Sequence, residues 1–152
     1  MMRTLYKSDI PQILVIEKSV HVAPWTDDTF TMCFKSGYFG WAVEEEGRII
    51  GFIIISLTKE ECHVLNLCVV HEHQHQGWGR KMLKHALSHA RQHGVGIAYL
   101  EVRRSNTRAI SLYRKMEFHL VGERKDYYPT VAGNEDALIF AMSLHLPLDD
   151  QI

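Results

Sequence analysis

Apolar residues recur at helical spacing between positions 10 and 20, and Pro11 lies where the first turn of a helix accepts proline. We expect Ser8 or Asp9 to cap this helix, since both side chains can accept hydrogen bonds from free backbone N–H groups. After a break at Pro24-Trp25, a second short helix is predicted, which is capped by Thr26 or Asp27 and runs to about Lys35.

Most of the remaining chain alternates between strand patterns and turns. We expect strands near Thr4 and over residues 38–43, 49–57, 62–70, 97–102, 118–123 and 137–144. The run 62–70 is too continuously apolar for an exposed edge, so it is predicted to lie centrally in a sheet. A turn-rich loop near Tyr128 and Pro129 is expected to join the last two strands.

Two further helices are predicted between the later strands. The first covers residues 77–93 and ends at Gly94, where a left-handed cap needs no Cβ. The second runs from a cap at Ser105 or Asn106 to about Met116. Because hairpins come first and a βαβ unit follows, the pattern predicts an α/β (α+β) protein with a mixed sheet. Without repeats or linkers, residues 1–152 are expected to form a single domain.

The composition is that of a globular protein, with 46% hydrophobic and 23% charged residues in a chain of 152. No apolar run approaches the ~18 residues of a membrane span, and the first residues lack a secretory signal. Cys33, Cys62 and Cys68 are too few and too scattered for a disulfide framework or a zinc site. A reducing cytoplasm is therefore the expected setting, with no membrane partner.

The net charge of −1 conceals an uneven distribution. Residues 77–116 contain nine Lys or Arg and one acid, Glu101, a net charge of +8, whereas residues 1–76 carry −4 and residues 117–152 carry −5. A basic middle third indicates an anionic partner, although a helix with a basic solvated face explains the count equally well.

The start of the predicted helix at Gly77 favours a phosphate site. Gly77 and Gly79 let a ligand approach the backbone, and the first N–H groups of a helix form an anion site. Two common phosphate-binding motifs are absent. GxxxxGK[ST] does not occur, and Met82 stands where GxGxxG requires its third glycine. The absence of acids from Gly77 to Leu100 favours a phosphate cradle over a purely structural turn.

The motif Gln74-x-x-Gly77-x-Gly79 after a buried strand resembles the acyl-CoA pyrophosphate loop of the GCN5-related N-acetyltransferase (GNAT) family. The element order resembles that fold over essentially the whole chain, which implies a mostly antiparallel sheet with helices on both faces. Other stretches resemble the members that acetylate the N-terminal alanine of a small-subunit ribosomal protein: Pro24-Trp25-Thr26, Leu100–Asn106, Ala109–Tyr113, Asp126–Thr130 and Glu135–Ala137.

The resemblance implies acetyl-CoA as acetyl donor. The backbone of Leu67, Cys68 and Val69 is expected to hold the pantetheine and thioester, with an N–H freed near Val69 by a bulge or splay as an oxyanion donor. The pyrophosphate would be bound by the backbone of a second set: His75, Gln76, Gly77, Trp78, Gly79 and Arg80. Asn106 matches a residue that contacts the cofactor, although a role as helix cap is equally good physics.

The resemblance also assigns Glu101 as general base and Tyr113 as general acid. An N-terminal amine with a pKa near ~7.7–8.0 is largely protonated at neutral pH, so a base is useful. The alternatives are that Glu101 forms an ion pair with Arg103 or Arg104 and that Tyr113 is a core aromatic. The amine attacks directly, and Cys68 is predicted to be a small buried strand residue rather than a nucleophile.

By the same resemblance, Trp25, Tyr127, Tyr128 and Asp136 should line the groove for a peptide N-terminus. An acidic rim would suit a basic ribosomal protein and could include Asp27, Asp28, Asp126 or Glu135. The expected protein is a monomer that binds no nucleic acid directly. Glu117 departs from the glycine that often ends this helix in relatives, which leaves the cap geometry open.

His85, His89 and His93 recur at four-residue steps, a spacing that can bind zinc. We predict a partly exposed polar face and no metal, since no further ligand is evident. Two other functions stay open: a GNAT enzyme with another protein N-terminus or a small-molecule amine as acceptor, and a non-catalytic CoA- or nucleic-acid-binding module. A mere binding module would need neither Glu101 nor Tyr113.

Overall fold

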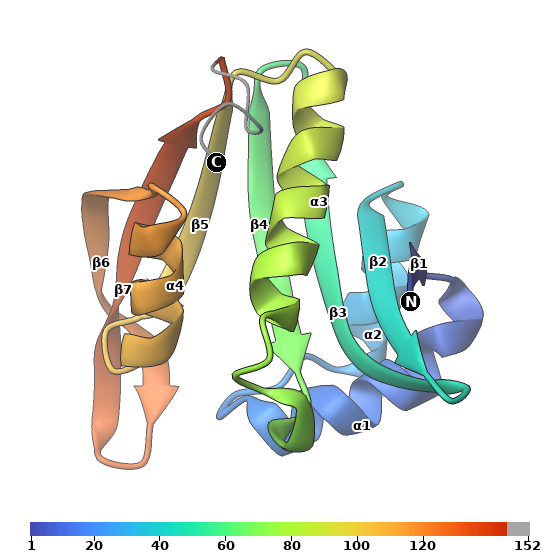
Figure 1. Cartoon of the computed structure of the whole chain (residues 1–152). Helices are drawn as coiled ribbons and strands as arrows, with labels where there is room; N and C mark the ends of the chain where they lie inside the picture. Colours follow the sequence, from blue (N-terminus) through green and yellow to red (C-terminus); the bar gives the residue numbers. More distant parts are fainter. Residues whose placement is uncertain (146–152) are drawn as a thin grey trace.

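A seven-stranded sheet in the order β1-β2-β3-β4-β5-β7-β6 forms the centre of the computed structural model, which describes residues 1–145 (Figure 1). The strands are β1 (Met2–Thr4), β2 (Phe39–Glu45), β3 (Arg48–Leu57), β4 (Glu61–Val69), β5 (Ile97–Arg103), β6 (His119–Thr130) and β7 (Gly133–Ser143). Among the strand pairs within residues 1–145, only β4 and β5 run parallel. The mixed, mostly antiparallel sheet and the central place of the 62–70 run are confirmed.

Helices cover both faces of this sheet, as expected. They are α1 (Ile10–Val20), α2 (Asp27–Lys35), α3 (Trp78–Gln92) and α4 (Thr107–Lys115), with short 3-10 turns at Lys7–Asp9 and His71–His73. One core cluster joins α1 and α2 to the sheet through residues such as Ile13 and Phe30, and the other lies beneath α3. No helix within the described residues is both long and apolar enough to cross a membrane.

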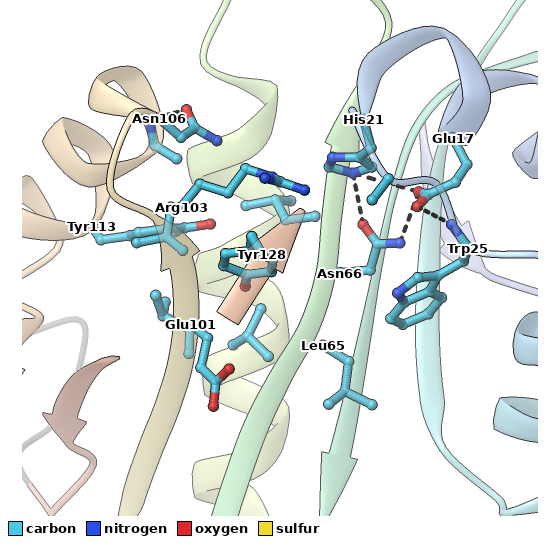
Figure 2. A pocket seen from close by; sticks show the side chains of 16 residues that line it. Glu17, His21, Trp25, Leu65, Asn66, Glu101, Arg103, Asn106, Tyr113 and Tyr128 are labelled. Carbon is cyan, nitrogen blue, oxygen red and sulfur yellow. Dashed lines mark hydrogen bonds and ion pairs between the residues drawn. The ribbon is translucent and has the colours of Figure 1, made fainter. Parts of the chain in front are cut away.

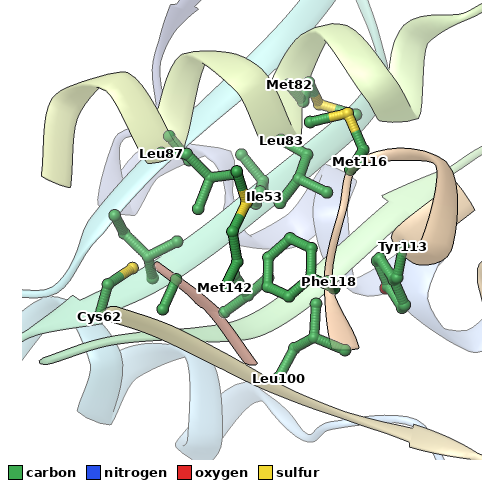
Figure 3. Packing of buried hydrophobic residues seen from close by; sticks show 14 of the residues in the cluster. Ile53, Cys62, Met82, Leu83, Leu87, Leu100, Tyr113, Met116, Phe118 and Met142 are labelled. Carbon is green, nitrogen blue, oxygen red and sulfur yellow. The ribbon is translucent and has the colours of Figure 1, made fainter. Parts of the chain in front are cut away.

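The core beneath α3 includes Phe118, which is 1% exposed, together with Met82 and Leu83 of the helix (Figure 3). The ring of Tyr113 packs against Phe118 with centroids 6.0 Å apart. Burial of apolar surface of this size stabilises the fold by roughly 1.5–3 kcal/mol for each large side chain. The same packing holds Tyr113 at the edge of the core, where α4 meets the sheet.

Helix caps account for two of the predicted boundaries. Thr26 accepts a hydrogen bond from the backbone N–H of Thr29 at 3.3 Å, and Asn106 accepts one from Ala109 at 3.2 Å. Asp9 occupies the N-cap position of α1, as one of the two predicted residues, but the predicted capping bond from its side chain to this helix is wrong. The Asp9 carboxylate instead accepts the N–H of Tyr6 at 2.7 Å and pairs with an arginine of β1, so it closes the preceding 3-10 turn.

The predicted loop near Tyr128 and Pro129 is also wrong, because both residues belong to β6 and the hairpin turns after Thr130. The pairing with β7 jumps between Arg124 and Tyr128, so three residues of β6 are absorbed in an irregularity. A local kink of this kind bends a strand without ending it. Pro129 is tolerated there because β6 is an edge strand.

β4 contains a bulge at Leu65. Two successive residues of β3 lie opposite Val64 and Asn66, so Leu65 between them is extra. Side chains alternate between the two faces of a sheet along a strand. One extra residue therefore turns each later side chain of β4 to the opposite face from the one it would otherwise have. Val64 accordingly packs beneath α3, whereas Cys68 packs beneath α1 and α2. The bulge therefore turns Asn66 toward α1.

Candidate active site

The cleft lies where β4 and β5 part. Their parallel pairing begins at Glu61 and ends with Val64 opposite Leu100, and a cavity of about 190 Å³ opens beyond this pair. One wall comes from β4 and the α1–α2 region and includes Glu17, His21, Trp25, Leu65 and Asn66 (Figure 2). The other comes from β5, α4 and β6 and includes Glu101, Arg103, Asn106, Tyr113 and Tyr128.

β4 presents a free edge to this cleft. The N–H of Val70 donates to the carbonyl of Ile50 at 2.9 Å, so that residue faces β3. The backbone N–H and C=O groups of successive residues point alternately to the two neighbours of a strand. Those of Cys68 therefore also point toward β3, while those of Leu67 and Val69 point to the open side. Of the two predicted alternatives near Val69, the splay is present, because β4 and β5 have parted after Val64, whereas the bulge lies earlier in β4, at Leu65.

The segment before α3 has the geometry of an anion site. Gly77 has φ +85° and His75 has φ +64°, and the first helical bond runs from Lys81 N–H to Gly77 O at 3.1 Å. The amides of residues 76–80 donate to no acceptor in the described part of the chain. A Cβ on Gly77 would meet nothing within 4 Å. These open amides fit the pyrophosphate of an acyl-CoA.

Side chains join this loop to its surroundings. The Gln74 amide donates to the carbonyl of Val69 at 2.9 Å and accepts from Arg108 of α4 at 3.3 Å. Lys81 places its ammonium 4.7 Å from the ring centroid of Trp78. The loop is thereby anchored both to the end of β4 and to α4.

Only part of the basic middle segment is available for phosphates. Arg103 donates to Glu135 at 3.1 Å and to the carbonyl of Pro129 at 2.8 Å, and Arg104 pairs with Glu123 and Asp136. Acids of the C-terminal third therefore neutralise two of the nine cations. These pairs fasten the β6–β7 hairpin to the end of β5.

Glu101 lines the cleft with its side chain 29% exposed. Its carboxylate lies 3.1 Å from Nε of Arg124 on β6. The alternative pairing with Arg103 or Arg104 is wrong, because the hairpin acids occupy both. The carboxylate is thus accessible from the cleft and held by one cation.

Tyr113 and Tyr128 line the same wall of the cleft as Glu101. Burial, and then the neighbouring Tyr128, raises the pKa of Tyr113 to about 12. Burial, and then the carboxylate of Glu101, raises the pKa of Tyr128 to about 12. Both phenols therefore stay protonated at neutral pH and can donate a proton. Arg103 lies 4.5 Å above the Tyr128 ring and fixes its position.

Of the residues predicted for the site, six line the cavity: Trp25, Leu67, Glu101, Asn106, Tyr113 and Tyr128. Asn106 caps α4 with Oδ1, and its Nδ2 has no partner within residues 1–145, so the cap leaves a donor for a ligand. Tyr127, 51% exposed, and Asp136, which accepts from the N–H of Asp126 at 3.0 Å, lie outside the cavity wall.

Sequence reasoning missed the buried carboxylate of Glu17, which is 1% exposed in the cleft wall. Ligand atoms of Glu17, His21 and Cys68 lie within 4.8 Å of one another, a spacing a metal could use. Both Glu17 oxygens already accept hydrogen bonds, however, and burial, followed by the Glu17 charge, raises the pKa of the Cys68 thiol. A protonated thiol is a poor metal ligand. The sequence signal that could have revealed Glu17 was the position of an acid on the apolar face of the first predicted helix.

The histidines of α3 pack against aromatic rings. His85 and His89 approach Trp41 with centroids 5.1 and 5.0 Å away, and His89 lies 4.3 Å from His93. Burial, and then the two flanking histidines, lowers the pKa of His89. Their four-residue spacing is thereby explained by packing against β2.

Comparison with known proteins points to one family. The sequence model of the acetyltransferase (GNAT) family matches residues 4–118. Over 143 residues the chain is 34% identical to the ribosomal protein bS18-alanine N-acetyltransferase of Escherichia coli strain K12, covering 94% of this chain and 97% of that protein.

Solved structures agree with this result. The crystal structure of the ribosomal-protein-S18-alanine N-acetyltransferase from Escherichia coli matches with a TM-score of 0.91 and 33% identity, over 97% of this chain and 95% of that one. The yncA structure from Salmonella typhimurium, solved with its cofactor acetyl-CoA, shares the fold with a TM-score of 0.81 at 20% identity, covering 97% and 95% of the two chains.

Proposed function

This chain belongs to the acetyltransferase (GNAT) family, and we propose that it transfers the acetyl group of acetyl-CoA to the N-terminal alanine of a small-subunit ribosomal protein. The observation that carries the proposal is the cleft between β4 and β5. It has a free strand edge on one side, and Glu101 and Tyr113 on the other.

The residues present fit acetyl-CoA. The open amides of residues 76–80 would bind its pyrophosphate, and the outward backbone groups of Leu67 and Val69 would bind the pantetheine. When bound, acetyl-CoA supplies an activated acetyl thioester. The Nδ2 amide of Asn106 gives the cleft one more donor.

Proton transfers fall to two side chains of β5 and α4. Glu101 accepts a proton from the α-ammonium of the peptide, directly or through a water, because a protonated amine has no lone pair for attack. Tyr113, a phenol with its pKa raised to about 12, donates a proton to the departing thiolate. No covalent enzyme nucleophile is required, and the buried Cys68 thiol is left out of the reaction.

The acceptor would enter between the α1–α2 region and the β6–β7 hairpin. Trp25 and Tyr128 line this side of the cavity, and the partly exposed carboxylate of Glu101 offers an entering peptide one negative charge beside Arg124. That charge suits a basic protein tail. The similarity to bS18-alanine N-acetyltransferases supports this acceptor, and an enzyme that modifies a ribosomal protein would act in the cytoplasm.

Acetyl transfer to synthetic peptides tests the proposal. The purified chain is incubated with acetyl-CoA and peptides that begin Ala-Arg, Ser-Arg or Met-Arg, and released CoA is measured. We expect the highest kcat/KM for the alanine peptide. Transfer to none of the peptides would overturn the proposal, and a clear preference for another N-terminus would reassign the acceptor.

A further inference from the structure

Glu17 joins three segments of the chain. Its Oε2 accepts the backbone N–H of Trp25 at 2.9 Å, and its Oε1 accepts Nδ2 of Asn66 at 2.9 Å (Figure 2). His21 completes the set, with Nε2 3.1 Å from Asn66 Oδ1 and 3.4 Å from Glu17 Oε1. Because a carboxylate this buried is costly without partners, these bonds hold α1, the start of α2 and β4 together.

The donors and acceptors of this network have one consistent direction. An ionised carboxylate only accepts, so Asn66 turns its amide nitrogen toward Glu17 and its oxygen toward His21. That oxygen also only accepts, so the hydrogen lies on Nε2 of His21. Every member is therefore matched, and exchanging one group for another of the same size would place two donors or two acceptors face to face.

The network lies at the point where the cleft begins. Asn66 directly follows the Leu65 bulge, which turns it toward α1, and Trp25 lies on the wall opposite Tyr128. The proposed acetyl-CoA contacts are the open amides of residues 76–80 and the outward backbone groups of Leu67. They involve none of the side chains of this network.

We propose that Glu17 is a positioning residue for the acceptor peptide. By holding Asn66 and the Trp25 amide, it fixes the wall of the cleft against which the peptide N-terminus lies. The inference rests on the proposed function and deepens it, since it assigns the α1–β4 wall to the acceptor rather than to acetyl-CoA.

A charge exchange tests this role. Asn66→Asp places two carboxylates face to face, and we expect the KM for an Ala-Arg peptide to rise about tenfold with that for acetyl-CoA changed by less than about twofold. Adding Glu17→Gln matches donors with acceptors again. The glutamine oxygen accepts from the Trp25 N–H, its amide nitrogen donates to the new aspartate, and that aspartate accepts from His21. The double variant should recover most of the lost peptide KM.

Asp9→Asn is the matched control. It removes another buried carboxylate from the start of α1, one bound to Arg3 and the Tyr6 amide instead of the cleft wall. It should lower thermal stability with both KM values unchanged. An unchanged peptide KM in Asn66→Asp, equal rises in both KM values, or no recovery in the double variant would overturn the inference. Failure of the unaltered chain to acetylate any peptide would instead overturn the proposed function, and the inference with it.

Discussion

The carboxylate of Glu101 on β5 lies 3.1 Å from Nε of Arg124, which reaches it from β6 across the intervening strand β7. The same carboxylate lines the cleft and is close enough to Tyr128 to raise the pKa of that phenol. The single acid of the basic middle segment is therefore held at the cleft by a cation from the C-terminal third.

Glu101→Gln should lower kcat by about 10²–10⁴-fold, because the amide cannot accept the proton of the acceptor amine. The Kd for acetyl-CoA, measured by calorimetry, should stay unchanged, since the proposed cofactor contacts are backbone groups of other segments and the side chain of Asn106. Glu123→Gln is the control, because this exposed acid pairs with Arg104 outside the cleft. A Glu101→Gln variant with the kcat of the unaltered chain would remove Glu101 as the base.

Tyr113→Phe should reduce kcat by about 10²-fold or more through loss of the proton donated to the leaving thiolate. Phenylalanine keeps the ring that packs 6.0 Å from Phe118, so the melting temperature should change little. Steady-state kinetics with a saturating peptide measure the effect. A normal kcat would leave Tyr113 as a packing residue only.

The free energy of unfolding should fall at alkaline pH, partly because of Tyr113. Burial, followed by Tyr128, raises the pKa in the folded chain from 10 to about 12. The neutral phenol is thus favoured by folding, so its contribution is complete below pH 10 and is lost as the pH rises toward 12. Urea unfolding at pH 8 and pH 11 should show a smaller alkaline loss in Tyr113→Phe than in the unaltered chain. Equal losses would contradict this assignment.

Local patterns predicted much of the fold and part of the site. The glycines that open and close α3, the Asn106 cap and the central place of β4 follow from short-range rules about backbone conformation and burial. Glu101 stood out because it is the only acid in a long basic segment. These features depend on residues close together in the sequence.

The missed features depend on partners far away. Glu17 is satisfied by Asn66, 49 residues later, and no local pattern reveals such a bond. The Leu65 bulge is set by packing on both sheet faces, which an apolar run cannot show. The length of β6 likewise depends on its pairing with β7, which continues beyond the irregularity before Tyr128.

Gly77→Ala should weaken acetyl-CoA binding by about tenfold, because a Cβ at φ +85° costs roughly 1–2 kcal/mol and distorts the open amides. Gly94→Ala is a close match, since Gly94 has φ +79° at the other end of α3 and an equally open Cβ position. Calorimetry should show a higher Kd only for Gly77→Ala, with similar losses of thermal stability. Equal Kd values for the two variants would show that the loop at Gly77 does not bind acetyl-CoA.

Glu117→Gly should stabilise the fold by about 1 kcal/mol. Glu117 has φ +70° at the end of α4, where the Phe118 N–H donates to Tyr113 O at 2.9 Å and the Glu117 N–H donates to Arg114 O at 3.0 Å. Glycine adopts this left-handed conformation without a Cβ penalty. Urea unfolding would measure the gain, and Glu117→Ala, which keeps a Cβ, should show none.

The position of the transferred acetyl group tests the central claim most directly. A peptide that begins Ala-Arg and contains one internal lysine is incubated with the chain and acetyl-CoA, then sequenced by fragmentation mass spectrometry. We predict a single acetyl group on the α-amine of the N-terminal alanine. Acetylation of the lysine side chain instead, or none at all, would contradict the account.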